Sequence, residues 1–265
     1  MAEIMSNSQL LSKRGMDMYQ KERIESIMDI LKENGYVTVK YLTKVLHYSN
    51  ATINRDLNVM ENQKLVARTY GGVELCENVS VPLEFRYHKE KISKRKISKL
   101  AADFISDGDT VFIDSSTTTE RMGDFMTNKK NITVITNNMA LAAHLSEYIP
   151  NVICTGGRVV ESPYMLDGID TIRTILAYNM DKMFFSTGGV SDDGIIKTGS
   201  DTYSFLCSCA MKNSKKKYFL IDHTKINVEP AYNIADFSQI DAVISDYRFP
   251  DDTKKKYADT EFYEV

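Results

Sequence analysis

The sequence predicts two folded units, an N-terminal winged helix-turn-helix followed by a larger, mainly parallel-sheet α/β domain. Three helical repeats of apolar residues, separated by capping residues, fill the chain between residues 21 and 60. A strand, a glycine pair and a second strand follow, and from residue 109 short apolar strands alternate with helical stretches. We expect a flexible tail at 1–18, the winged helix-turn-helix at 19–75, a linker at 76–85 and the α/β domain at 86–265.

Composition excludes several classes of protein. The 265 residues are 43% hydrophobic, which is enough for a core in each of two domains. No apolar run approaches the roughly 20 residues of a membrane span, and the N-terminal segment lacks the apolar core of a secretion signal. The four cysteines (Cys76, Cys154, Cys207 and Cys209) have neither a paired spacing nor nearby histidines. We therefore expect a cytoplasmic protein without disulfides, metal, cofactor or membrane contact.

Charge is distributed unevenly along the chain. Residues 1–99 carry 17 Lys and Arg against 12 Asp and Glu, whereas the remainder carries 16 against 24. A basic portion before an acidic one is typical of nucleic-acid binding, although solvated helix faces explain it equally well. The run from Arg86 to Lys99 predicts an amphipathic helix that ends near Asp107-Gly108, and we favour a solvated face over phosphate contact for its cations. Its expected apolar face is Ile92, Ile97, Leu100, Ala101, Phe104 and Ile105.

The first helix of the N-terminal unit is predicted to end at Asn34-Gly35, which supplies a left-handed cap. Thr38 can cap the second helix and Ser49 the third. The expected buried residues are Ile24, Ile27, Met28 and Leu31 in the first helix, Val39, Leu42, Val45 and Leu46 in the second, and Ile53, Leu57 and Met60 in the third.

The third helix leaves a polar face free to enter a DNA major groove. This face consists of Asn50, Thr52, Asn54, Arg55 and Asn58. The strands at Leu65–Thr69 and after Tyr70-Gly71-Gly72-Val73 then form the wing.

In the large domain, strands are expected at 110–113, 132–135, 152–154, 183–186, 218–221 and 242–245, and helices at 119–126 and 140–148. Ligands of open α/β sheets bind beyond the carboxyl ends of the strands. There, residues Asp114-Ser115-Ser116-Thr117-Thr118-Thr119 place hydroxyls and N–H groups at a helix N-terminus, which suits an anion. A plain helix cap explains this loop by itself. Because polar turns also follow the other strands, a shared pocket is the better explanation, with Lys225 supplying a cation.

These residues resemble the DeoR family of sugar-responsive bacterial regulators. In the first unit the resemblance lies in Gly35-x-Val37-x-Val39-x-x-Leu42, Ser49-x-x-Thr52-Ile53-Asn54-Arg55-Asp56-Leu57 and Arg68-x-Tyr70-Gly71-Gly72. The family usually has arginine at Asn54 and histidine at Tyr70, which implies an altered operator preference. The DNA-binding residues that we expect are Thr38, Ser49, Asn50, Ala51, Thr52, Asn54, Arg55, Arg68, Tyr70, Gly71 and Gly72.

The large domain also resembles this family, whose effector domain is similar to ribose-5-phosphate isomerase and the coenzyme A transferases. Matching stretches are Asp107-Gly108-Asp109-Thr110, Asp114 with Thr117-Thr118-Thr119, Thr136-Asn137, Gly156-Gly157, Asp181-Lys182 with Gly188, and Asp222 with Thr224-Lys225. The family usually has glycine at Ser116, and an acidic residue and a Val-Lys-Arg run within 203–209. The expected effector-binding residues are Asp114, Ser115, Ser116, Thr117, Thr118, Thr119, Asn137, Gly156, Gly157, Arg158, Gly188, Asp222 and Lys225.

The resemblance implies a repressor of a carbohydrate operon that binds operator DNA and is relieved by a phosphorylated sugar or related anionic metabolite. We expect it to work as a homo-oligomer, a dimer or tetramer, on repeated half-sites. One alternative is an effector-independent regulator whose large domain only oligomerises. Another is a sugar-phosphate isomerase, for which Asp114 and Asp222 are available as acid or base but to which no catalytic residue is assigned.

Overall fold

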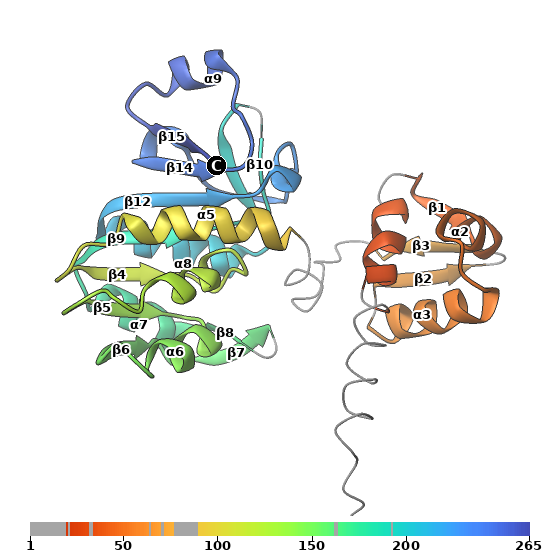
Figure 1. The fold of residues 1–265 in the computed structure, drawn as a ribbon, viewed down its shortest axis with the longest axis horizontal. Coiled ribbons are helices and arrows are strands. Elements are labelled where there is room, and N and C mark those ends of the chain that lie inside the picture. The colour runs from red at the N-terminus through yellow and green to blue at the C-terminus, as the bar shows by residue number, and fades with distance from the viewer. Residues whose placement is uncertain are drawn as a thin grey trace, which may run out of the picture. The chain divides into compact units, whose positions relative to one another are not determined.

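The computed structural model describes residues 20, 22–31, 34–63, 65–69, 72–76, 90–161, 164–191 and 193–265. The chain divides into two compact units, Met1–Lys89 and Glu90–Val265 (Figure 1). The expected tail at 1–18 and all of the expected linker except Cys76 lie outside the described residues.

The N-terminal unit is a trihelical core with a small antiparallel sheet. A helical segment at 22–31 is followed by α2 (Val39–Leu46) and α3 (Asn50–Asn62). Thr38 and Ser49 cap α2 and α3 as predicted, since their side chains accept from the N–H groups of Tyr41 and Thr52. Gly35 has the expected positive φ, +70°. The predicted core residues are buried except in α2, where only Leu42 is buried and Val45 is exposed.

The sheet of this unit has the order β1-β3-β2 and contains one strand that the sequence did not predict. β2 (Val66–Thr69) and β3 (Gly72–Leu75) form the predicted wing. β1 (Tyr36–Thr38) pairs antiparallel with β3, and its three residues are too few to show an alternating pattern. The Tyr36 ring covers Gly72 closely, since a Cβ at this position would lie 2.3 Å from the ring and the tyrosine side chain would have to move.

The large unit is built on a parallel sheet, as the alternating pattern predicted (Figure 1). The sheet has seven strands, and its edge strand β15 (Glu261–Glu264) was not among the six that the sequence predicted. Its spatial order is β15-β14-β12-β9-β4-β5-β6, and every neighbouring pair is parallel. The strands are β4 (Thr110–Ile113), β5 (Thr133–Thr136), β6 (Asn151–Cys154), β9 (Met180–Phe185), β12 (Ser214–Ile221), β14 (Ala242–Ser245) and β15 (Glu261–Glu264).

Each face of this sheet has its own apolar core, because successive side chains of a strand point to opposite faces. Val111 and Ile113 pack with α5 (Lys91–Asp103), the 3-10 helix η1 (Thr119–Phe125) and α6 (Met139–Leu145). Phe112 packs on the other face, with α7 (Ile169–Leu176) and α8 (Asp201–Lys212).

Smaller elements complete the unit, and the sequence did not predict them. A second sheet has the order β10-β11-β13 and contributes residues to the core on the α8 face. The remaining elements are β7 (Arg158–Glu161), β8 (Met165–Asp167), β10 (Gly189–Val190), β11 (Ile195–Thr198), β13 (Tyr232–Asp236), α9 (Asp251–Lys256) and the 3-10 helices η2 (His223–Lys225) and η3 (Phe237–Gln239).

The helices differ from the sequence expectation in three respects. The stretch after Thr118 is a 3-10 helix with no side-chain cap. In α5, Ile92 was assigned to the apolar face but is 77% exposed. Lys94 was assigned to the solvated face but is only 3% exposed, because its position falls on the side of α5 that packs toward the sheet. Among the described helices, none is both long and apolar enough to cross a lipid bilayer.

Candidate functional site

The order in which the chain adds strands to the sheet changes side between β4 and β9, and this switch point is where a ligand is expected. The chain runs outward from β4 through β5 to β6 and then returns to β9 on the other side of β4. In open α/β sheets the crevice at such a switch point, beyond the carboxyl ends of the strands, is the usual binding position. Here the residues that follow the two strands are Asp114 and Ser186.

Asp114 holds the two sides of the switch point together. The backbone N–H of Ser116 donates to one carboxyl oxygen at 3.2 Å, and that of Ser186 donates to the other at 3.1 Å. The hydroxyls of Thr119 and Tyr203 also donate to Asp114, which is fully buried. Burial raises the pKa of Asp114, against the lowering effect of these hydrogen bonds. Four protein donors engage this carboxyl group, so we interpret Asp114 as a residue that positions the loops after β4 and β9.

The hydroxyl-rich loop 115–119 is packed against α5. The Ser98 hydroxyl donates to the Thr118 carbonyl at 2.5 Å, and the Lys94 ammonium donates to the Thr117 hydroxyl at 3.2 Å. Within the loop, the Thr119 N–H donates to the Ser116 hydroxyl at 3.1 Å, so the departure from the usual glycine adds an internal contact. Thr117, Thr118 and Thr119 are all buried.

Lys94 is the functional candidate that sequence reasoning missed. It belongs to a run of cations, and its α5 neighbours Lys91, Arg95, Lys96 and Lys99 are exposed as expected. The one signal in the sequence is its helical spacing, since Lys94 lies three residues before the buried Ile97 and seven before the buried Ala101. Its ammonium gives the hydroxyl loop a buried cation.

Asn137 follows β5 and brings an unpaired acceptor to the same place. Its amide nitrogen donates to the Leu166 carbonyl at 3.1 Å and lies 3.4 Å from the Ser115 hydroxyl. Its side-chain oxygen is buried and has no hydrogen-bond partner among the described residues. A buried polar atom without a partner costs about 1–3 kcal/mol, so this oxygen is suited to accept a hydrogen bond from a ligand.

The glycines after β6 have a structural role. A Cβ on Gly157, whose φ is +114°, would lie 2.5 Å from the Thr171 hydroxyl oxygen and 2.6 Å from the Asp167 carbonyl. Thr171 donates to the Gly156 carbonyl at 2.6 Å, which fastens this turn to α7. Arg158, at the start of β7, is exposed.

The other predicted residues lie at the ends of β9 and β12. After β9, a Cβ on Gly188 would meet Pro230 at an ordinary 3.4 Å, whereas one on Gly189 would lie 2.0 Å from the Val228 carbonyl oxygen. After β12, the Asp222 side chain caps η2 by accepting from the Thr224 N–H at 3.1 Å. Lys225 is the last residue of η2 and is half-buried.

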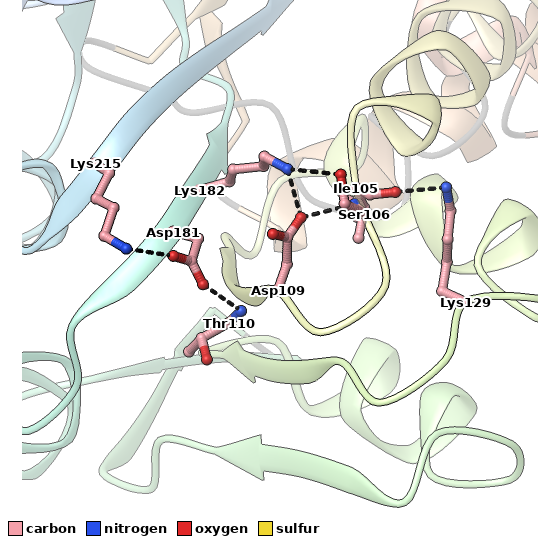
Figure 2. A network of polar contacts seen from close by, with 8 residues as sticks. All are labelled: Ile105, Ser106, Asp109, Thr110, Lys129, Asp181, Lys182 and Lys215. Carbon is pink, nitrogen blue, oxygen red and sulfur yellow. Dashed lines mark hydrogen bonds and ion pairs between the residues drawn. The ribbon is translucent and has the colours of Figure 1, made fainter.

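Some family-matching residues lie at the opposite, amino edge of the sheet (Figure 2). The Lys182 ammonium lies 2.5 Å from the Asp109 carboxylate, and Asp109 also accepts from the Ser106 N–H at 2.7 Å. Asp181 accepts from the Thr110 N–H at 2.9 Å and from Lys215 at 2.8 Å. This network joins the starts of β4, β9 and β12, so it stabilises the sheet and takes no part in the switch-point site.

An open hollow of about 610 Å³ lies elsewhere, around β10 and β11. Its lining includes Lys197 and Glu229, which form an ion pair at 2.7 Å, and Asp193, whose pKa is lowered by a hydrogen bond from Ser191. Because these charged groups already have partners within the chain, the switch point is the better candidate for a ligand site.

The candidate DNA-binding face is the exposed side of α3 together with β2. Asn50, Ala51 and Arg55 are exposed, and Thr52 and Asn54 are half-exposed. Arg68 reaches from β2 to α3, where it donates to the Asn54 carbonyl at 3.0 Å and to its side chain at 3.3 Å. Asn54 in turn donates to the Asn50 side chain at 2.7 Å. The Arg55 guanidinium has no polar partner among the described residues, so it is available to a ligand.

Asp56, next to Arg55 in the matching motif, points inward. It is fully buried and accepts from Arg23 at 2.7 and 3.0 Å and from Gln20 at 2.8 Å. The ion pair raises the pKa of Arg23 and fixes α3 against the first helix. The predicted wing residues Tyr70 and Gly71 lie outside the described residues.

Comparison with known proteins identifies the class. Residues 23–79 match the DeoR-like helix-turn-helix domain and residues 89–247 match the DeoR C terminal sensor domain. The chain therefore belongs to the DeoR family, as its motifs predicted.

Individual relatives are similar over nearly their whole length. The HTH-type transcriptional repressor GlcR of Bacillus subtilis is 31% identical over 232 residues, which cover 86% of this chain and 89% of the relative. The glycerol-3-phosphate regulon repressor of Escherichia coli is 28% identical over 86% of this chain and 92% of the relative. The lactose phosphotransferase system repressor of Staphylococcus aureus is 29% identical over 87% and 93%. Ribose 5-phosphate isomerase from Plasmodium falciparum is a solved structure with TM-score 0.37 and 11% identity, covering 50% of this chain and 52% of the isomerase.

Proposed function

We propose that this protein is a transcriptional repressor of a carbohydrate operon, which binds operator DNA and releases it when a phosphorylated sugar binds the sensor domain. The observation that carries the proposal is the pairing of the two DeoR domains in one chain. Relatives that match almost end to end are named repressors of glycerol-3-phosphate and lactose phosphotransferase genes. The exposed face of α3, with Arg55 and Asn50, would read the operator.

The chemistry of the switch point supports a sugar phosphate as effector. The Lys94 ammonium and the hydroxyls of Ser115, Thr117 and Thr118 offer donors to a phosphate group, and Lys225 would add a second cation. The unpaired oxygen of Asn137 can accept a hydrogen bond from a sugar hydroxyl. A ligand with both a phosphate and a hydroxyl group would use the donors and also the Asn137 oxygen, whereas a simple anion would leave that oxygen without a partner.

We propose a regulatory and not a catalytic role for this site. Asp114 directly follows β4 at the switch point, and four protein donors already engage it. A general base needs a free acceptor within reach of the substrate proton. We also propose that the protein acts as a homo-oligomer in the cytoplasm, where operator DNA and sugar phosphates meet, with its four cysteines as free thiols.

Operator binding of the intact chain, measured by fluorescence anisotropy, tests the proposal. The titration is repeated with sugar phosphates, sugar acids and free sugars, and melting of the free protein is followed with each compound. We expect a sugar phosphate to raise the melting temperature and weaken operator binding. Thr117→Val, which removes the hydroxyl next to Lys94, should weaken this response, whereas Thr127→Val at an exposed position should not. If no compound changes either quantity, the large domain serves oligomerisation only.

A further inference from the structure

Three side chains with metal-binding atoms meet in the large unit, next to the predicted effector residues Asp222 and Lys225 but not among them. Glu90 lies directly before α5, His223 begins η2 after β12, and Asp246 follows β14. One potential ligand atom from each residue lies within 4.8 Å of the other two. Glu90 lies more than a hundred residues before His223, and His223 lies 23 residues before Asp246, so the spacing of histidines and cysteines predicted no metal site.

Hydrogen bonds hold this group in place. The Nδ1 atom of His223 lies 2.7 Å from one oxygen of Asp246, and the backbone N–H of His223 donates to the other oxygen at 2.7 Å. The Ser93 hydroxyl donates to Glu90 at 3.5 Å. Glu90 occupies the N-cap position of α5 but makes no side-chain capping bond, so its carboxylate accepts no hydrogen bond from the helix backbone as a cap. Both carboxylates are half-buried, and the imidazole is at the surface.

We propose that Glu90, His223 and Asp246 form a binding site for a divalent transition-metal cation of the Zn²⁺ type. One imidazole nitrogen and two carboxylate oxygens form a donor set that suits Zn²⁺, whereas Mg²⁺ prefers oxygen ligands alone. Ligand atoms at the usual Zn²⁺ distances lie about 3.4 Å apart in a tetrahedral site. Side-chain rotations that move these atoms by about 1 Å would bring all three within bonding distance of one cation. Three protein ligands leave the fourth position to water or a small ligand.

The position of the site gives the cation a definite structural effect. Glu90 is the residue at which the chain enters the sensor unit, and His223 and Asp246 are fixed to two neighbouring strands of its sheet. A bound cation would fasten the start of α5 to the carboxyl ends of β12 and β14. Since α5 also contacts the hydroxyl-rich loop 115–119 through Lys94 and Ser98, metal binding would stabilise the helix that links the metal site to this loop.

The test is titration of the intact, untagged and chelator-treated protein with Zn²⁺, followed by calorimetry and thermal melting. We expect one Zn²⁺ per chain with micromolar or tighter affinity, a raised melting temperature, and little response to Mg²⁺. Glu90→Gln and His223→Gln should each weaken binding at least tenfold. Visible absorption of the Co²⁺-loaded wild-type protein provides a readout that does not depend on the folding of any variant.

A second histidine–carboxylate pair in the same unit supplies the matched control. His144 lies 3.8 Å from Asp124, both side chains are 46% exposed, and neither belongs to the group of three ligands. His144→Gln should therefore leave Zn²⁺ affinity unchanged. The proposal is overturned if Zn²⁺ does not bind, if binding is indifferent to Glu90→Gln and His223→Gln, or if it is lost equally in His144→Gln. In these cases the cluster is an ion pair between His223 and its carboxylates.

Discussion

Replacing Asp56 should strongly destabilise the DNA-binding unit and leave the stability of the sensor unit unchanged. Asp56 is fully buried and Arg23 is only 14% exposed, so Asp56→Ala leaves a largely buried guanidinium without its carboxylate. Removing one partner of a buried pair costs about 3–5 kcal/mol. A domain of about 60 residues has a free energy of unfolding of only about 3–9 kcal/mol, so the loss is comparable with the whole.

Hydrogen exchange of the intact chain, read by mass spectrometry, measures this effect separately for each unit. Amides of 22–31 and α3 should exchange between about a hundredfold and a few thousandfold faster, because each 1.4 kcal/mol is a factor of ten. Amides of the large sheet should be unchanged. Glu61→Ala is the control, since the Arg68–Glu61 pair is exposed and 3.5 Å apart and should contribute at most about 1 kcal/mol. An Asp56→Ala protein with wild-type exchange in 22–31 would show that the pair does not hold α3 in place.

Three further predictions concern DNA binding, backbone space and pH. Arg55→Ala should weaken operator binding by about 1–3 kcal/mol without changing the melting temperature, measured by anisotropy and calorimetry; unchanged affinity would remove Arg55 from the interface. Gly189→Ala should destabilise the sensor unit, because its Cβ would lie 2.0 Å from the Val228 oxygen, whereas Gly188→Ala should be tolerated; equal melting temperatures would contradict this. Hydrogen bonding to Lys215 lowers the pKa of Asp181, so this carboxylate stabilises the fold above its unfolded pKa, and the stabilisation is lost as the pH falls through the folded pKa. Asp181→Asn should therefore lower the melting temperature near neutral pH and reduce its decline in acid, and parallel pH profiles would count against this role.

The order of the elements and most of the core could be predicted because each depends on local sequence. Helical spacing placed Ile53, Leu57 and Met60 inside, and Thr38 and Ser49 cap the helices they precede. Central strands are buried on both faces, so they are continuous apolar runs, and β4 was predicted with its observed ends. Two of the strands that escaped prediction, β1 and β10, contain only three and two residues, so they are defined by pairing with their neighbours and not by a local pattern.

The sequence by itself determined the family, the two units and the loops that gather at the carboxyl edge of the sheet. Only the tertiary structure decided what each polar residue in those loops contacts. Asp114 is engaged by four donors, Asn137 keeps an unpaired oxygen, and Lys94 is buried beside Thr117. The physical reason is that a hydrogen bond depends on which strands become neighbours. The order β9-β4-β5 brings together residues that are 22 and 72 positions apart in the chain.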